Sequence, residues 1–213
     1  HIVFELGFVD SLLTVILNRL GVQEVHAAVL GWKKKAILMP GKAGSGKTTT
    51  SLQLVKEGFT LLADDQVFLK EVKQNINAFA NNNKLRFLLG NKSIDLFPEL
   101  KFLKKLPYSK MKPLPKRALT AAQLKKIYNC KFSKEEKIQA IVFPRITTRK
   151  TSRIKPISSQ QALVKLLGKT SRSKKSLIKD QLGITKQFNL FCLLSTKYPA
   201  YNLEIGQDNK NVP

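Results

Sequence analysis

Short apolar runs separated by turn residues, with longer amphipathic stretches between them, dominate the pattern along this chain. Apolar residues recur at helical spacing over residues 4–20, which predicts an amphipathic helix that packs on a sheet. Two apolar runs joined by a glycine-containing turn predict a hairpin over 25–39. Further apolar runs predict strands over 59–69, 139–146 and 200–205. Such mixing of strands and helices indicates an α/β fold, a mixed β-sheet flanked by helices.

The remaining pattern fills in one domain over residues 1–206, with a tail at 207–213. We expect the remaining elements as follows: a helix ending at 57, strands at 75–79 and 85–89, a turn at 81–84, a loop at 97–115, helices at 118–128, 158–167 and 184–196, and a polar segment at 169–180. Ser158 and Gln161 form a predicted capping box at the start of one helix. The chain begins with His1 rather than Met, so we expect a trimmed start.

A phosphate-binding loop is the strongest chemical signal. Residues 41–48 read Gly-Lys-Ala-Gly-Ser-Gly-Lys-Thr, the complete G-x-x-x-x-G-K-[ST] motif, between a predicted strand and a predicted helix. Glycines allow the backbone amides to approach phosphate oxygens, Lys47 supplies a charge for the β and γ phosphates, and the Thr48 hydroxyl is a Mg²⁺ ligand. The predicted ATP-binding residues are Gly41, Lys42, Ala43, Gly44, Ser45, Gly46, Lys47, Thr48 and Thr49.

A pair of carboxylates follows the helix. Asp64 and Asp65 end the apolar run 61–63. Neighbouring residues of a strand face opposite ways, so a kink or strand end is needed to aim both at the phosphates. One would then hold Mg²⁺, and the other would accept a proton from an attacking hydroxyl. The alternative is an Asp pair that opens an ordinary turn.

His26 is the third candidate. It lies in the apolar run 25–30, on a strand expected beside the one that leads to the phosphate loop. A histidine at a strand start is more often structural than catalytic, so both interpretations stay open from the residues alone.

Taken together, these segments resemble the core of HPr kinase/phosphorylase and its relatives, a superfamily that includes the ATP-dependent phosphoenolpyruvate carboxykinases. The resemblance is carried by 26–30, the loop at 41–48 and the stretch 57–67, and more loosely by 140–145, 156–167 and 198–205. It implies a fold like the HPr kinase C-terminal domain and a Mg²⁺- and ATP-dependent kinase. The smaller single-domain relatives are the closer match, and some of these phosphorylate a serine near the end of a peptide.

The resemblance also implies roles for individual residues. Lys47 would hold the β and γ phosphates, and Thr48 with Asp64 would hold Mg²⁺. Asp65 would be the general base, and His26 would lie near the transferring group. Arg145 would stabilise transition-state charge, or would equally be a solvent-facing strand residue.

One position departs from the family. HPr kinase carries an acidic second metal ligand directly after the loop Ser/Thr, where this chain has Thr49. This departure leaves open whether the resemblance extends to the reverse phosphorylase reaction and to HPr as substrate. It does suggest a homo-oligomer, since HPr kinases form hexamers.

Composition adds one further feature, a formal net charge of +24 over 213 residues. Such a charge attracts nucleic acid, an anionic membrane surface or acidic proteins, or it reflects only a lysine-rich solvated surface. Two cysteines without a secretion signal favour the cytoplasm, and residues 4–20 are too polar for a membrane span. We therefore expect a kinase that acts on a hydroxyl group of a protein, peptide or small molecule. If the basic segment 97–117 docks this acceptor, the acceptor is expected to be acidic. The alternative is a basic P-loop NTPase or nucleic-acid-binding module, and a carboxykinase-like reaction ranks last.

Overall fold

The computed structural model describes residues 2–80, 86–108, 115–170 and 180–207. In chain order, the elements are α1 (Ile2–Arg19), β1 (Val22–Val25), β2 (Ala27–Trp32), β3 (Lys35–Pro40), α2 (Lys47–Lys56), β4 (Thr60–Ala63), β5 (Val67–Val72), β6 (Asn75–Ala80), β7 (Arg86–Leu89), α3 (Asn91–Asp95), the 3-10 helix η1 (Pro98–Lys105), β8 (Arg117–Thr120), α4 (Ala121–Tyr128), β9 (Glu135–Ile146), β10 (Arg153–Ile157), α5 (Ser159–Thr170), α6 (Gln181–Lys197) and β11 (Ala200–Ile205).

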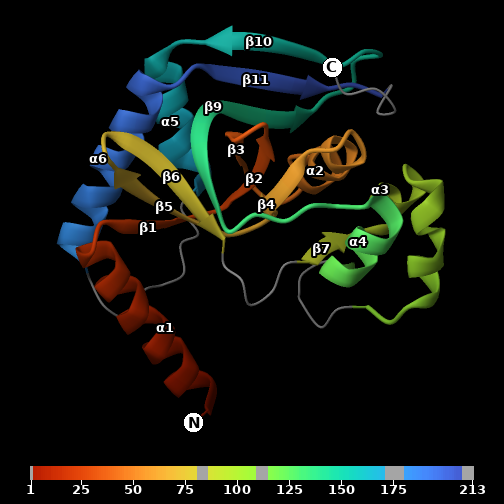
Figure 1. Ribbon diagram of the computed structural model, residues 1–213, viewed down its shortest axis with the longest axis horizontal. Helices are drawn as coiled ribbons and strands as arrows, with labels where there is room; N and C mark the ends of the chain where they lie inside the picture. The colour runs from red at the N-terminus through yellow and green to blue at the C-terminus, as the bar shows by residue number, and fades with distance from the viewer. Residues whose placement is uncertain (1, 81–85, 109–114, 171–179, 208–213) are drawn as a thin grey trace.

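A curled mixed sheet organises the molecule (Figure 1). Its strand order is β1-β5-β6-β9-β3-β2-β4, and β11 joins β9 and carries β10. The 12-residue strand β9 is long enough to pair antiparallel with β6 near its start and parallel with β3 and β11 further on. Because β3, β9 and β11 run parallel, their carboxyl ends meet at one edge, where ligands bind in open α/β sheets.

Helices cover both faces of this sheet. Alternate residues of β9 join different cores: Ile141 and Phe143 pack with α5 and α6, and Val142 packs with α2. In Figure 1, α5 and α6 lie on one side of the strands and α2 lies on the other. The predicted α/β class, a mixed sheet with flanking helices, is confirmed.

Helix α1 occupies a different place from the one predicted. It packs against α6 and the edge strand β1 rather than across a sheet face, and Asn18 donates a hydrogen bond to Asp180 of the α6 N-cap at 3.0 Å. None of the described helices is long and apolar enough to span a membrane.

Residues 86–128, which we call the basic lobe, include the largest departure from the sequence pattern. The predicted loop at 97–115 contains η1, whose Leu100 and Leu103 are fully buried. This spacing of three matches the 3-10 period, and Pro98 suits the first helical turn. Two buried leucines in an eight-residue helix carry too little periodicity for a sequence-based prediction.

Other departures concern strands. The run 59–69 forms two strands, β4 and β5, because the chain bends over Asp64, Asp65 and Gln66. Strand β10 was not predicted, since it is a mostly exposed edge strand containing Pro156. The predicted capping box is confirmed: the Gln161 amide donates to Ser158 Oγ at 3.3 Å and the Ser158 amide donates to Gln161 Oε1 at 3.2 Å. The expected turn at 81–84, the tail from 208 and most of the polar segment at 169–180 lie outside the described residues.

Candidate active site

The phosphate loop connects β3 to α2 and requires glycine at two positions. Gly44 and Gly46 have φ angles of +81° and +101°, which residues with a Cβ rarely adopt. A Cβ at Gly46 would also lie 2.5 Å from Ile205 Cδ1. Helix α2 begins directly after it, so the helix N-terminus and its unpaired amides face the loop. The local geometry is that of an anion-binding cradle.

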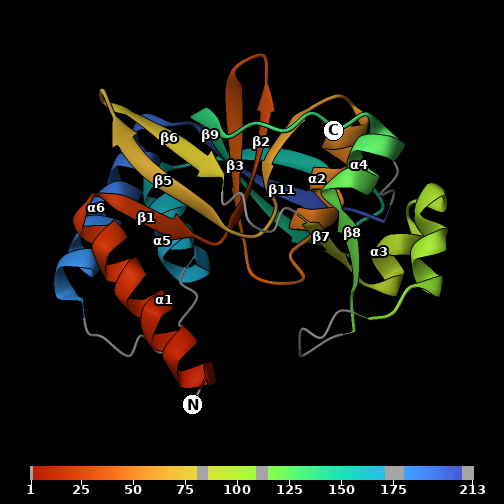
Figure 2. The ribbon, with the colours of Figure 1, turned by 60° about the horizontal axis from the view of Figure 1, so that its bottom comes forward.

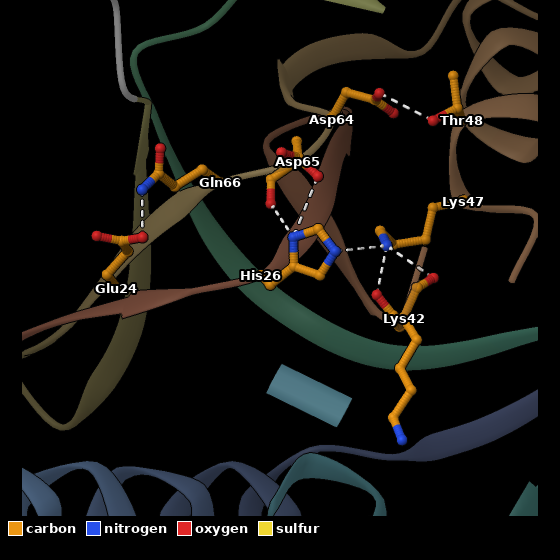
Figure 3. A network of polar contacts seen from close by, with 9 residues as sticks. Glu24, His26, Lys42, Lys47, Thr48, Asp64, Asp65 and Gln66 are labelled. Atoms are coloured by element: carbon orange, nitrogen blue, oxygen red, sulfur yellow. Dashed lines mark hydrogen bonds and ion pairs between the residues drawn. The ribbon is translucent and has the colours of Figure 1, made fainter. Parts of the chain in front are cut away.

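Lys47 is held inside this loop. Its side chain is 6% exposed, and Nζ donates hydrogen bonds to the carbonyl of Gly41 and, at 3.3 Å, to that of Lys42. The ammonium group also lies 3.2 Å from His26 Nε2. By contrast, the Lys42 side chain extends away from the cluster (Figure 3). The structure therefore places Lys47, and not Lys42, beside His26, which in turn contacts Asp65.

The sequence predicts that His26 lies within a strand, but the structure places it between β1 and β2. Its Nδ1 is 2.7 Å from the backbone oxygen of Asp65 and 3.1 Å from the Asp65 carboxylate. A carbonyl oxygen only accepts, so Nδ1 carries the hydrogen and donates it. Nε2 is then the acceptor for the Lys47 ammonium group, which assigns one tautomer from the network.

Asp64 and Asp65 stand in the bend between β4 and β5 and face different partners (Figure 3). Thr48 Oγ1 donates a hydrogen bond to Asp64 Oδ2 at 3.0 Å, while Asp65 contacts His26. The bend thus resolves the problem of adjacent strand residues facing opposite ways, and the predicted carboxylates both lie beside the loop.

The two carboxylates differ in their surroundings. Asp64 is only 8% exposed, whereas the Asp65 side chain is 48% exposed. Burial, together with the neighbouring Asp65 charge, raises the pKa of Asp64 to about 7, although the Thr48 hydrogen bond and the Lys47 charge oppose this. Among the described residues, Asp64 Oδ1 is buried without a hydrogen-bond partner. A buried carboxylate beside a hydroxyl offers the hard oxygen ligands that suit Mg²⁺.

The Asp64 environment predicts a pH-dependent stability in the absence of metal. The folded-state pKa of Asp64, about 7, lies above its ordinary value of 3.8, so protonation of this carboxyl favours folding. The contribution is fully present below about pH 4 and is lost as the pH rises through about 7. The loss is on the order of 4 kcal/mol at most, at ~1.4 kcal/mol per pKa unit. Urea unfolding of Asp64→Asn should show a flatter profile between these pH values, while the exposed-surface control Glu71→Gln retains the wild-type slope. Parallel profiles for Asp64→Asn and wild type would contradict the assignment.

Arg145 is not part of the His26 and Asp65 cluster in this structure. Its side chain is 69% exposed, and Nη2 donates to Glu204 at 3.0 Å. Arg149 and Arg153 contact the same carboxylate at 3.3 and 3.9 Å. The next residue, Ile146, does reach the loop, since its Cγ1 would lie 3.4 Å from a Cβ at Gly46. The proposed transition-state role of Arg145 therefore stays a prediction.

One contact beside the site was not anticipated. Gln66 donates a hydrogen bond to Glu24 of β1, which joins the bend to the strand preceding His26 (Figure 3). The two residues are 42 positions apart, and only the antiparallel pairing of β1 with β5 brings them together. Nothing in the local sequence signals this.

Comparison with known proteins points in one direction. No family model matches the chain. The HPr kinase/phosphorylase of Chlorobaculum tepidum is 24% identical over 146 residues, 68% of this chain. That of Clostridium acetobutylicum is 31% identical over 67 residues, and that of Caldicellulosiruptor bescii is 34% identical over 68, which are 31% and 32% of this chain. The chain is HPr kinase-like. The matches cover 36%, 22% and 22% of the lengths of these three relatives, so the activity of the whole relatives does not transfer directly to this HPr kinase-like chain.

A solved structure is also similar, that of the HPr(Ser) kinase/phosphatase from Coxiella burnetii. It shares 13% identity, with 88% of this chain and 87% of that chain covered and a TM-score of 0.43.

Proposed function

We propose that this HPr kinase-like chain is an ATP-dependent kinase that transfers the γ-phosphoryl group to a hydroxyl group. The observation that carries the proposal is the convergence of Lys47, His26, Asp64 and Asp65 on one loop through the contacts described above. Phosphoryl transfer needs positioning, charge stabilisation and a group that orients or deprotonates the nucleophile. The residues gathered here supply each of these.

Asp65 is the proposed general base. It is the more exposed carboxylate of the pair, so an acceptor hydroxyl can reach it. His26 donates its Nδ1 hydrogen to Asp65, and this holds the carboxylate beside the imidazole. Because the histidine also accepts from Lys47, one imidazole couples the phosphate-binding lysine to the base. His26 is thus proposed as a positioning residue.

Thr48 and Asp64 are the proposed Mg²⁺ ligands. Two protein oxygens suffice, since Mg²⁺ in nucleotide sites keeps waters and phosphate oxygens in its remaining positions. When bound, the ion supplies charge neutralisation at the phosphates. Asp64 would hold the ion in its carboxylate form, and the ion would offer a partner to a side chain whose Oδ1 lacks one among the described residues.

Substitution of Thr48 tests the metal site. Thr48→Val keeps the shape of the side chain but removes its oxygen, so we expect the Mg²⁺ concentration for half-maximal ATP hydrolysis to rise about tenfold to a hundredfold, the equivalent of one contact to a charged group. Thr48→Ser restores the hydroxyl and serves as the matched control. Equal Mg²⁺ dependence in Thr48→Val and Thr48→Ser would remove Thr48 from the site.

The transfer reaction itself is testable without a known acceptor. The protein is incubated with γ-labelled ATP and a library of serine-containing peptides, and the same library with alanine in place of serine is the control. The proposal predicts Mg²⁺-dependent label on the serine library only. ATP turnover with no label on peptides, proteins or small hydroxyl compounds would reject a kinase.

The net charge of +24 favours a second candidate, a basic P-loop NTPase that binds nucleic acid. That function predicts ATP hydrolysis stimulated by single-stranded DNA or RNA, with binding that weakens steeply as salt rises. Hydrolysis that is indifferent to nucleic acid at low salt favours the kinase.

A further inference from the structure

The basic lobe carries a disproportionate share of the positive charge. Residues 86–128 hold 11 of the 38 basic residues and only 2 of the 14 acidic ones, a net of +9. Both acidic side chains are already engaged within the structure. Asp95 pairs with Lys104, and Glu99 pairs with Lys56 of α2 at 3.0 Å and accepts from Tyr128 at 2.8 Å. The lobe therefore has no further carboxylate of its own to neutralise the other lysines.

Apolar side chains are exposed among these lysines. On η1, Lys101 and Lys105 are exposed, and Phe102 between them is 39% exposed. Leu106 and Leu96 are each 38% exposed nearby in the chain. The 3-10 period places Phe102 and Lys105 in one row along the helix. A merely solvated basic face has no need of large apolar groups, whereas a face that binds a chain with both charge and apolar side chains does.

The lobe is anchored beside the candidate active site. Ala80, the last described residue before it, pairs with Val67, two positions after Asp65, and its amide donates to the Lys134 carbonyl at 2.9 Å. The chain thus leaves the sheet next to the Asp64–Gln66 bend and returns there. Figure 2 shows α3 and α4 beside α2, the helix that begins at Lys47.

Packing fixes the lobe in this orientation. Phe87 and Leu100 of the lobe share a buried cluster with Leu52 and Val55 of α2. The Lys56–Glu99 ion pair joins the same two units at the surface. A polypeptide bound on η1 would consequently be held at a set position relative to the phosphate loop.

We propose that the exposed face formed by Lys101, Phe102 and Lys105 of η1 and by Leu106, its C-cap residue, docks an acidic polypeptide that also carries apolar side chains. This inference rests on the proposed function, and it deepens it by locating the surface on which a polypeptide acceptor docks. Charge complementarity attracts the partner, and burial of Phe102 and Leu106 selects among acidic chains. Leu96 and Leu106 offer nothing to a phosphate backbone, which favours a peptide over a nucleic acid.

The test selects ligands without assuming one. A random displayed-peptide library is panned against the wild-type protein, against Lys101→Glu/Lys105→Glu and against the control Lys35→Glu/Lys155→Glu. The control changes the net charge equally at exposed positions of β3 and β10. Thermal unfolding of each variant verifies that it is folded. The Phe102→Ala variant separates apolar recognition from charge.

The proposal predicts peptides enriched in both acidic and apolar residues. Their affinity should fall roughly tenfold or more in Lys101→Glu/Lys105→Glu and about threefold or more in Phe102→Ala, and should change little in the charge-matched control. Equal losses in the control, or an unaffected Phe102→Ala, would overturn it. The proposal would also be overturned if no peptide is selected while Lys101→Glu/Lys105→Glu selectively loses binding to single-stranded DNA.

Failure of this inference is distinguishable from failure of the proposed function. Wild-type protein is titrated with Mg·ATP in parallel. If the protein binds Mg·ATP but no lobe-dependent peptide is selected, only the docking face is rejected. If the protein does not bind Mg·ATP, the proposed kinase function is rejected.

Discussion

Asparagine at position 65 should slow phosphoryl transfer by roughly a hundredfold to ten-thousandfold, the range expected for loss of a general base. ATP affinity should change by less than about threefold, because Asp65 faces His26 rather than the phosphate loop. The substitution is nearly isosteric. The His26 Nδ1 hydrogen bond to the backbone oxygen of residue 65 does not depend on the side chain, so the histidine keeps its position.

Single-turnover assays measure this directly, with water or a selected serine peptide as the acceptor. Glu71→Gln, an exposed carboxylate on β5, is the matched control and should transfer at the wild-type rate. If Asp65→Asn transfers phosphate as fast as Glu71→Gln, Asp65 is not the base.

Loss of the Lys47 charge is expected to have the second large effect. Lys47→Met retains the aliphatic stem, which fits a buried site, but removes the ammonium group. Truncating one partner of a buried charged contact costs ~2–5 kcal/mol, so ATP affinity should fall by roughly thirtyfold to several thousandfold. The carbonyls of Gly41 and Lys42 also lose their shared donor, which loosens the loop before nucleotide arrives.

Calorimetric titration with Mg·ATP measures the change. Lys35→Met, at the exposed start of the strand that leads to the loop, is the control and should bind as wild type does. An affinity in Lys47→Met within about threefold of this control would mean that the lysine does not contact the phosphates.

Local features of this chain were predictable from sequence where one residue type admits one geometry. The phosphate-loop segment carries glycines at 44 and 46, and both have positive φ angles in the structure. Gly58, with a φ of +90°, follows the C-cap of α2, close to the predicted helix end at 57. Their buried apolar residues made β3, the later part of β9 and β11 readable as apolar runs. The loop, the carboxylate pair and the histidine are predictable as candidates because each is a local feature of the sequence.

The relations between elements were not predictable in the same way. Bending of the 59–69 run after Ala63 depends on β4 pairing with β2 while β5 pairs with β1, which no local pattern encodes. The fold of η1 depends on the burial of Leu100 and Leu103 in an apolar cluster that includes residues of α2. The resemblance alone does not predict the contact of Arg145 with Glu204, which follows from the parallel register of β9 and β11.

The central claim is that the loop at 41–48 and the Asp64–Asp65 bend together bind a metal–nucleoside triphosphate. Isothermal titration of the folded protein with ATP, with Mg²⁺ and with Mg²⁺ replaced by a chelator, tests it most directly. We expect saturable binding at one site that depends on Mg²⁺ and strengthens as the pH rises through about 7, where Asp64 ionises. Heats that are absent, or unchanged when Mg²⁺ is removed, would contradict the account.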